Sequence, residues 1–109
     1  LLASAVASDL GGPLTVLRAD GGLTRSRLLM QAQADLLQLP VEVCRTPDAT
    51  ALGVAALARI GLGQAAGVEQ AVGPADLEAV IEPRIGADEA AERMAGFARA
   101  LQATLAAAR

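Results

Sequence analysis

Apolar residues recur along the chain at two spacings, one typical of helices and one typical of strands. The first ten residues predict the end of a helix, which Gly11-Gly12 and Pro13 terminate. Leu14 to Ala19 then places apolar side chains at alternate and at adjacent positions, which is the pattern of a strand covered on both faces. Asp20-Gly21-Gly22 breaks this strand, and the glycines favour a tight turn.

The helical spacing returns after the turn. Apolar positions over residues 24–39 form one stripe, which predicts a helix with Thr24 as its N-cap. The alternation of Val41 to Cys44 predicts a short strand, placed at the edge of a sheet. A second helix is predicted over residues 49–60, where Gly53 and neighbouring alanines would allow a close approach to another element.

The last part of the chain predicts less regular structure before a long helix. Residues 64–73 show no clear period and are interpreted as a surface connection. Residues 74–80 predict a short helical turn beginning near Pro74, and residues 81–86 an extended segment. Asp88-Glu89 opens a helix that runs to the C-terminus, because acidic groups suit the positive end of the helix dipole.

The order of these elements predicts an α/β fold with helices packed on a small sheet and with parallel neighbouring strands. Two convincing strands are too few for a sheet that is stable by itself. The chain also lacks an initiator Met. We therefore expect residues 1–109 to be a fragment of a longer protein.

The amino-acid composition argues against several kinds of functional site in this chain. The chain has a net charge of −3, no His, and nine cationic residues that are all Arg and are scattered along the sequence. This scatter argues against a nucleic-acid surface, and the lack of His excludes His-based acid–base catalysis within the chain. The lone Cys44 permits no internal disulfide, fits a reducing compartment, and is interpreted as a small buried hydrophobe. No apolar run is long enough to predict a membrane span.

The candidate chemistry lies in the glycine turn. Two glycines after a buried strand let backbone N–H groups approach a ligand closely, and the N-terminus of the next helix favours an anion. Arg25 and Arg27 would add positive charge there. The pattern matches neither a G-x-G-x-x-G nor a P-loop motif. On this chemistry alone, an anion site and a turn without a ligand remain equally open.

Four segments together resemble the C-terminal domain of the FGGY carbohydrate kinases, and within that family the glycerol kinase branch. They are Asp20-Gly21-Gly22, Met30-Gln31-Ala32-Gln33-Ala34-Asp35, Pro40-Val41-Glu42-Val43 and Thr50-Ala51-Leu52-Gly53. The resemblance implies a ribonuclease H-like fold of the actin-like ATPase and sugar kinase type. It also implies transfer of the γ-phosphate of ATP, with Mg²⁺, to a hydroxyl of a sugar or polyol.

The resemblance assigns nucleotide contacts to Gly22 and Ser26, and the shaping of the turn to Gly21. It assigns to Asp20 the holding of the loop rather than a contact with phosphate. Glycerol kinases usually carry Asn at the position of Ser26. No residue of this chain matches the catalytic Asp of the family, which belongs to the N-terminal domain, and no metal ligand is assigned. Residues 1–109 would then be part of a C-terminal nucleotide-binding domain, inactive alone and located in the cytoplasm.

Some questions stay open at the level of sequence. A non-catalytic actin-like domain that binds nucleotide or another subunit is the alternative to a kinase. The chain has Gly61-Leu62-Gly63 where family members have Gly-Phe-Trp, so the sugar or polyol is not assigned. The expected partners are ATP or ADP and that substrate, with neither nucleic acid nor membrane, and a homo-oligomer is left open.

Overall fold

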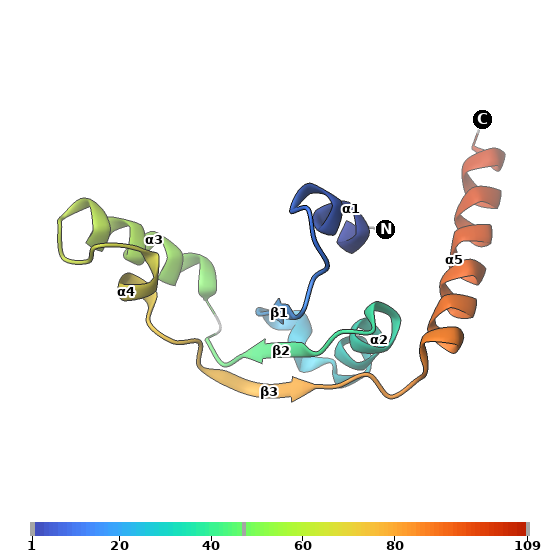
Figure 1. The fold of residues 1–109 in the computed structure, drawn as a ribbon, viewed down its shortest axis with the longest axis horizontal. Helices are drawn as coiled ribbons and strands as arrows, with labels where there is room; N and C mark the ends of the chain where they lie inside the picture. Colours follow the sequence, from blue (N-terminus) through green and yellow to red (C-terminus); the bar gives the residue numbers. More distant parts are fainter. Residues whose placement is uncertain (1, 47, 109) are drawn as a thin grey trace.

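The computed structural model describes residues 2–46 and 48–108, which form an open arc of helices around a small sheet (Figure 1). The radius of gyration is 17.6 Å, whereas a compact domain of this length would have about 13 Å. The elements in chain order are α1 (Leu2–Asp9), β1 (Leu17–Ala19), the 3₁₀ helix η1 (Gly22–Arg25), α2 (Arg27–Leu37), β2 (Val41–Cys44), α3 (Ala49–Gly61), α4 (Val68–Val72), β3 (Leu77–Ile81) and α5 (Ala87–Ala107).

The sheet of the described chain has the strand order β1-β2-β3. β1 pairs with β2 in parallel, with Leu17 opposite Val41, as expected for neighbouring strands joined by a helix. β3 pairs antiparallel on the other side of β2, with Ile81 also opposite Val41. β2 is therefore the central strand, and its expected place at the edge was wrong because β3 occupies that edge.

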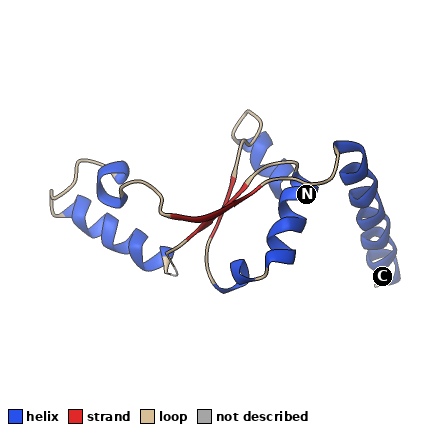
Figure 2. Cartoon of the chain, turned by 90° about the horizontal axis from the view of Figure 1, so that it is seen from below, coloured by secondary structure: helices blue, strands red, loops and turns tan. Residues whose placement is uncertain are grey.

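The main core lies between α2 and the sheet. Met30 and Ala34 of α2 are buried against Val41 and Val43 of β2, and half-buried apolar side chains of β1 and β3 pack around them. Figure 2 shows the strands crossing as one twisted ribbon, and Figure 1 shows α3 and α4 beyond one end of the sheet and α5 beyond the other. The sheet, with α2 packed on it, thus lies between the α3–α4 pair and α5.

Two predictions for the C-terminal part of the chain were wrong. Residues 74–80 were expected to form a helical turn, but Leu77–Ile81 forms β3. Residues 64–73 were expected to be an irregular connection, yet they contain the short helix α4. Pairing with β2 stabilises β3 against the helical preference of its Leu, Glu and Ala residues. The predictions of α1, α3 and β2 are confirmed, and that of α5 is confirmed as far as Ala107, while residues 1 and 109, which were also expected to be helical, lie outside the described residues. β1 is shorter than the predicted Leu14 to Ala19, and Cys44 is half-buried rather than buried.

The α3–α4 pair, residues 49–72, leaves the sheet after β2 and returns at β3. The backbone N–H of Arg45 donates to the carbonyl oxygen of Asp76 over 2.9 Å, and the Arg45 guanidinium pairs with the Asp76 carboxylate at 3.3 Å. Within the pair, small buried alanines bring α3 and α4 together. The close approach expected at Gly53 is not seen, since a Cβ there would meet nothing within 4 Å.

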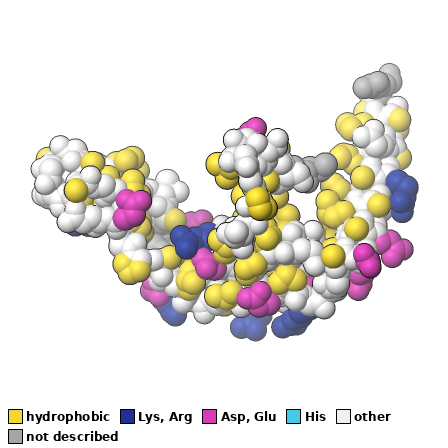
Figure 3. Space-filling view, viewed as in Figure 1, with side chains coloured by type: hydrophobic (Ala, Val, Ile, Leu, Met, Phe, Trp, Pro, Cys, Tyr) yellow, Lys and Arg dark blue, Asp and Glu magenta, His cyan; other side chains and the backbone are white. Residues whose placement is uncertain are grey.

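Much apolar surface lies outside these clusters. Leu28 is 83 % exposed, Leu2 80 % and Phe97 56 %. Figure 3 shows apolar side chains along α5 and on the α1 region. Phe97 and Met94 of α5 face Leu2 and Val6 of α1 across an apolar groove of about 640 Å³. No helix within residues 2–46 and 48–108 combines the length and the apolar character needed to cross a bilayer.

Candidate functional site: the glycine turn before α2

Gly21 supplies a backbone conformation that other residues rarely adopt. Its φ of 88° and ψ of −176° lie in a region open almost only to glycine. The hydroxyl of Thr24 donates to the carbonyl oxygen of Gly21 over 2.7 Å, and this holds the turn. Asp20, which was expected to hold the loop, is exposed and makes no side-chain hydrogen bond within the described chain. Thr24 therefore has the role that the sequence assigned to Asp20.

Gly22 opens η1 and is exposed. Its φ is not positive, and a Cβ built on it would meet nothing within 4 Å. Neither backbone conformation nor packing within the described chain therefore requires glycine at this position. An atom from outside the chain can approach the Gly22 backbone from this open side.

Ser26 is the N-cap of α2. Its hydroxyl accepts a hydrogen bond from the backbone N–H of Leu29 over 3.3 Å, and the Ser26 backbone is extended, with φ −81° and ψ 95°. Thr24 was expected to be the N-cap, and this was wrong because η1 occupies the first predicted turn and delays the helix by two residues. The structure thus puts Gly21, Gly22 and Ser26 on one short segment at the start of α2, where Gly22 and Ser26 are exposed and Gly21 is half-buried.

A hydrogen-bond network on α2, not foreseen from the sequence, anchors the connection between β3 and α5. Asp35, 8 % exposed, accepts from the backbone N–H of Arg84 over 2.7 Å and from the Gln31 amide over 2.9 Å. These bonds, that from Arg84 above all, lower the pKa of Asp35 from its ordinary value. The amide of Gln38 reaches the carbonyl oxygen of Ile85 over 3.1 Å. The i, i+4 spacing of Gln31 and Asp35 was the only local signal of this network.

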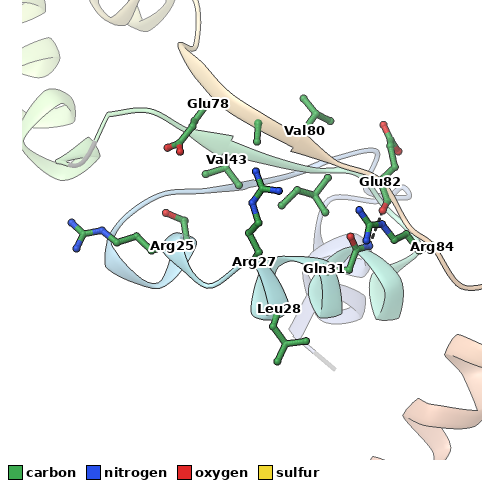
Figure 4. A pocket seen from close by; sticks show the side chains of 12 residues that line it. Arg25, Arg27, Leu28, Gln31, Val43, Glu78, Val80, Glu82 and Arg84 are labelled. Atoms are coloured by element: carbon green, nitrogen blue, oxygen red, sulfur yellow. Dashed lines mark hydrogen bonds between the residues drawn. The ribbon is translucent and has the colours of Figure 1, made fainter.

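A cavity of about 660 Å³ lies beside the turn, between α2 and β3. Arg25, Arg27 and Arg84 all line it, as Figure 4 shows. Arg27 points into the space between α2 and the strands, whereas Arg25 points away. The arginines that are scattered in the sequence are therefore partly gathered in space. Neither here nor elsewhere among the described residues do three Asp, Glu, Cys or His side chains come together in a way that could hold a metal ion.

Residues 2–62, more than half of the chain, match the model of the C-terminal domain of the FGGY family of carbohydrate kinases. The chain belongs to this family. The resemblance found in the sequence is thereby confirmed, and the matched residues include η1, α2 and the whole glycine turn.

Curated relatives in the FGGY family include glycerol kinases. That of Methylibium petroleiphilum is 43 % identical over 96 residues, which cover 88 % of this chain and 19 % of the relative. That of Bordetella parapertussis is 41 % identical over 101 residues, covering 93 % of this chain and 20 % of the relative. The chain therefore spans about a fifth of the length of these relatives.

Solved structures of FGGY-type kinases share the fold. The glycerol kinase of Plasmodium falciparum, crystallised with ADP, superposes with a TM-score of 0.76 at 25 % identity over 95 % of this chain and 21 % of its own. The xylulose kinase of Rhodospirillum rubrum gives a TM-score of 0.68 at 34 % identity over 94 % of this chain and 21 % of its own. The predicted α/β, ribonuclease H-like fold class, with helices on a small sheet, is confirmed.

Proposed function

We propose that residues 1–109 are part of the C-terminal, nucleotide-binding domain of an ATP-dependent carbohydrate or polyol kinase. The full-length protein would transfer the γ-phosphate of ATP to a hydroxyl of glycerol or a related polyol. The observation that carries this proposal is Gly22, a glycine that the fold itself does not require, exposed directly before α2 in the part of the chain matched to the family. Glycerol kinases among the relatives support glycerol as the first substrate to test.

The turn fits a nucleotide in three respects. The open side of Gly22 leaves room for a phosphate to approach the backbone N–H. The first turn of α2 carries N–H groups that lack partners within the helix, and these favour an anion. The hydroxyl of Ser26 adds a polar group at the same end of α2. Gly21 would set the shape of the turn, while Gly22 and Ser26 would contact the nucleotide.

Mg²⁺ would enter with ATP and neutralise charge on its phosphates during transfer. The proposal assigns no metal ligand and no catalytic group to this chain. The catalytic carboxylate and most sugar contacts are assigned to the remainder of the full-length protein, which we propose to be cytoplasmic. Phosphoryl transfer depends on holding donor, acceptor and metal together, so residues 1–109 alone would be inactive.

The decisive experiment is a coupled assay of ADP release with the full-length protein and glycerol, xylulose or gluconate as acceptor. We expect turnover with glycerol, and we expect Gly22→Val to weaken ADP binding. Gly12→Val is the matched control, because Gly12 also has no positive φ and has open space around its Cβ position. ADP release with none of the acceptors, together with ADP binding, would favour the non-catalytic alternative. Unchanged ADP affinity in Gly22→Val would remove Gly22 from the site.

A further inference from the structure

The cavity between α2 and β3 differs from the proposed nucleotide contact in position and in charge. Thr24, Arg25 and Arg27 line it, but neither Gly22 nor Ser26 does. The cavity therefore adjoins the groups that would hold the nucleotide, but those groups are not part of its lining. Its volume of about 660 Å³ falls within the usual range for small-molecule sites, about 300–1,000 Å³.

The arginines at this cavity have no partner of their own. Most other arginines of the described chain are engaged: three pair with carboxylates and one donates to a carbonyl oxygen, namely Arg18, Arg45, Arg93 and Arg59. Within the same residues, the guanidinium groups of Arg25, Arg27 and Arg84 make neither an ion pair nor a hydrogen bond. The unpaired guanidinium groups of Arg27 and Arg84 thus lie at one cavity, whereas that of Arg25 points away from it.

Two glutamates also border this cavity. Along β3, Ala79 and Ile81 are half-buried and pack toward α2. Glu82 lies at an alternate position, and Figure 4 shows its carboxylate on the side of β3 that faces away from Arg27. Glu78 lies at the register shift between β2 and β3, and Figure 4 shows its side chain on the other side of β3, towards Val43. Arg27 and Arg84 therefore share the space between α2 and β3 with one carboxylate, that of Glu78.

Hydrogen bonds to α2 hold the segment that carries Arg84 in place. The backbone N–H of Arg84 donates to the buried carboxylate of Asp35 over 2.7 Å. Gln31, which also lines the cavity, donates from its amide to the carbonyl oxygen of Glu82 over 2.9 Å. Proline at position 83 further restricts the connection between these contacts. Arg27 on α2 and Arg84 on this connection thus line one cavity, and hydrogen bonds join the two elements to each other.

We propose that this cavity binds a small organic phosphate, at a site separate from the nucleotide, with Arg27 and Arg84 holding the phosphate group. Guanidinium groups match phosphate oxygens through paired hydrogen bonds, and two of them from different elements suit a phosphate better than a single carboxylate. Val43, Ala79 and Ile81 form an apolar floor, which suits the organic part of the ligand. The site goes beyond the proposed kinase function and does not depend on turnover.

The test is a calorimetric titration of the full-length protein with phenyl phosphate, with and without saturating ADP. We expect binding in both cases, and we expect Arg27→Gln and Arg84→Gln each to weaken it about tenfold. Arg99→Gln is the matched control, because Arg99 is also exposed and unpaired but lies on α5; its effect should stay within about twofold. Circular dichroism checks that each variant is folded.

Three outcomes would overturn the proposal. One is loss of phenyl phosphate binding on saturation with ADP, because the cavity would then belong to the nucleotide site. Another is unchanged affinity in both Arg27→Gln and Arg84→Gln. The third is equal affinity for inorganic phosphate and phenyl phosphate, which would leave no role for the apolar floor. A protein that fails to bind ADP but still binds phenyl phosphate would contradict the kinase proposal and support this one.

Discussion

The carboxylate of Asp35 accepts a hydrogen bond from the backbone N–H of Arg84, which is 49 residues further along the chain. This bond lowers the pKa of Asp35 in the folded protein, whereas the unfolded chain keeps the ordinary value of an aspartate. A lowered folded pKa contributes stability above the unfolded value, and that contribution is lost as the pH falls through the folded value. We expect Asp35→Asn to destabilise the full-length protein more at about pH 7 than at about pH 3, in urea unfolding at both pH values.

A suitable control for Asp35 is Asp48→Asn. Asp48 precedes α3, is exposed, and makes no side-chain hydrogen bond to the helix. Its replacement should change the free energy of unfolding little at either pH. An equal loss for Asp35→Asn at both pH values would show that its carboxylate does not carry the effect.

Gly21 and Gly22 should separate stability from binding. Gly21→Ala forces a Cβ onto a backbone with φ of 88°, which we expect to cost about 1–3 kcal/mol of unfolding free energy. Gly22→Ala meets open space, so its cost should be within about 0.5 kcal/mol. ADP titration should nevertheless show weaker binding for Gly22→Ala. The same pattern in both variants would contradict the distinct roles of the two glycines.

Ser26 offers a test of the N-cap together with the nucleotide contact. Ser26→Ala removes the acceptor for the Leu29 N–H, and the expected loss is about 1 kcal/mol. Ser26→Asn keeps a good capping side chain and introduces the residue usual in glycerol kinases, so it should retain stability and bind ADP at least as well. Denaturation and ADP titration are measured on the same three proteins. Equal ADP affinity in all three would remove the side chain of Ser26 from the contact.

Met30 and Leu28 test the core of the fold. Met30 is 6 % exposed and packs against Val41 and Val43, so Met30→Ala should cost about 2–5 kcal/mol. Leu28 is two positions away on the same helix but 83 % exposed, and Leu28→Ala should cost less than about 0.5 kcal/mol. Chemical denaturation of the full-length protein measures both. A large loss for Leu28→Ala would show that the remainder of the protein buries that side chain.

The isolated chain, residues 1–109, should behave differently from the full-length protein. Its apolar groove between α1 and α5, with Phe97 and Leu2 exposed, should bind a hydrophobic fluorescent dye and promote association. It should release no ADP from ATP in the presence of glycerol. Dye fluorescence and size-exclusion chromatography compare the two proteins. Monomeric behaviour without dye binding would contradict this expectation.

The four longer helices, α1, α2, α3 and α5, and the first two strands were predictable because their signals are local, whereas η1 and α4 were not predicted. α5 follows its apolar spacing from Ala90 onward, and β2 follows the alternation of Val41 and Val43. β3 was missed because its stability comes from β2, whose residues lie more than 30 positions earlier. The alternation of Leu77, Ala79 and Ile81 was present, but Pro74 and the helix-forming residues after it favoured a turn.

For the site, the sequence predicted the turn and its glycines but not what surrounds them. The φ of Gly21 agrees with a glycine-specific turn. The presence of Arg27 and Arg84 at one cavity depends on how β3 and α2 pack, and no local pattern in the sequence indicates that residues 57 positions apart line the same cavity. The nucleotide contacts of Gly22 and Ser26 stay predictions until ADP binding is measured.

The contact between Arg45 and Asp76 has a consequence for how this family can vary. It brings together the chain segments before and after the α3–α4 pair, where β2 ends and β3 begins. The pair is therefore an insertion between β2 and β3 whose two ends are in contact. A segment whose ends are already joined can gain or lose residues at its far side with little change in loop-closure entropy. The α3–α4 pair is therefore the part of the domain in which we expect homologues to differ most in length, while the register of β2 on β3 and the turn before α2 stay unchanged.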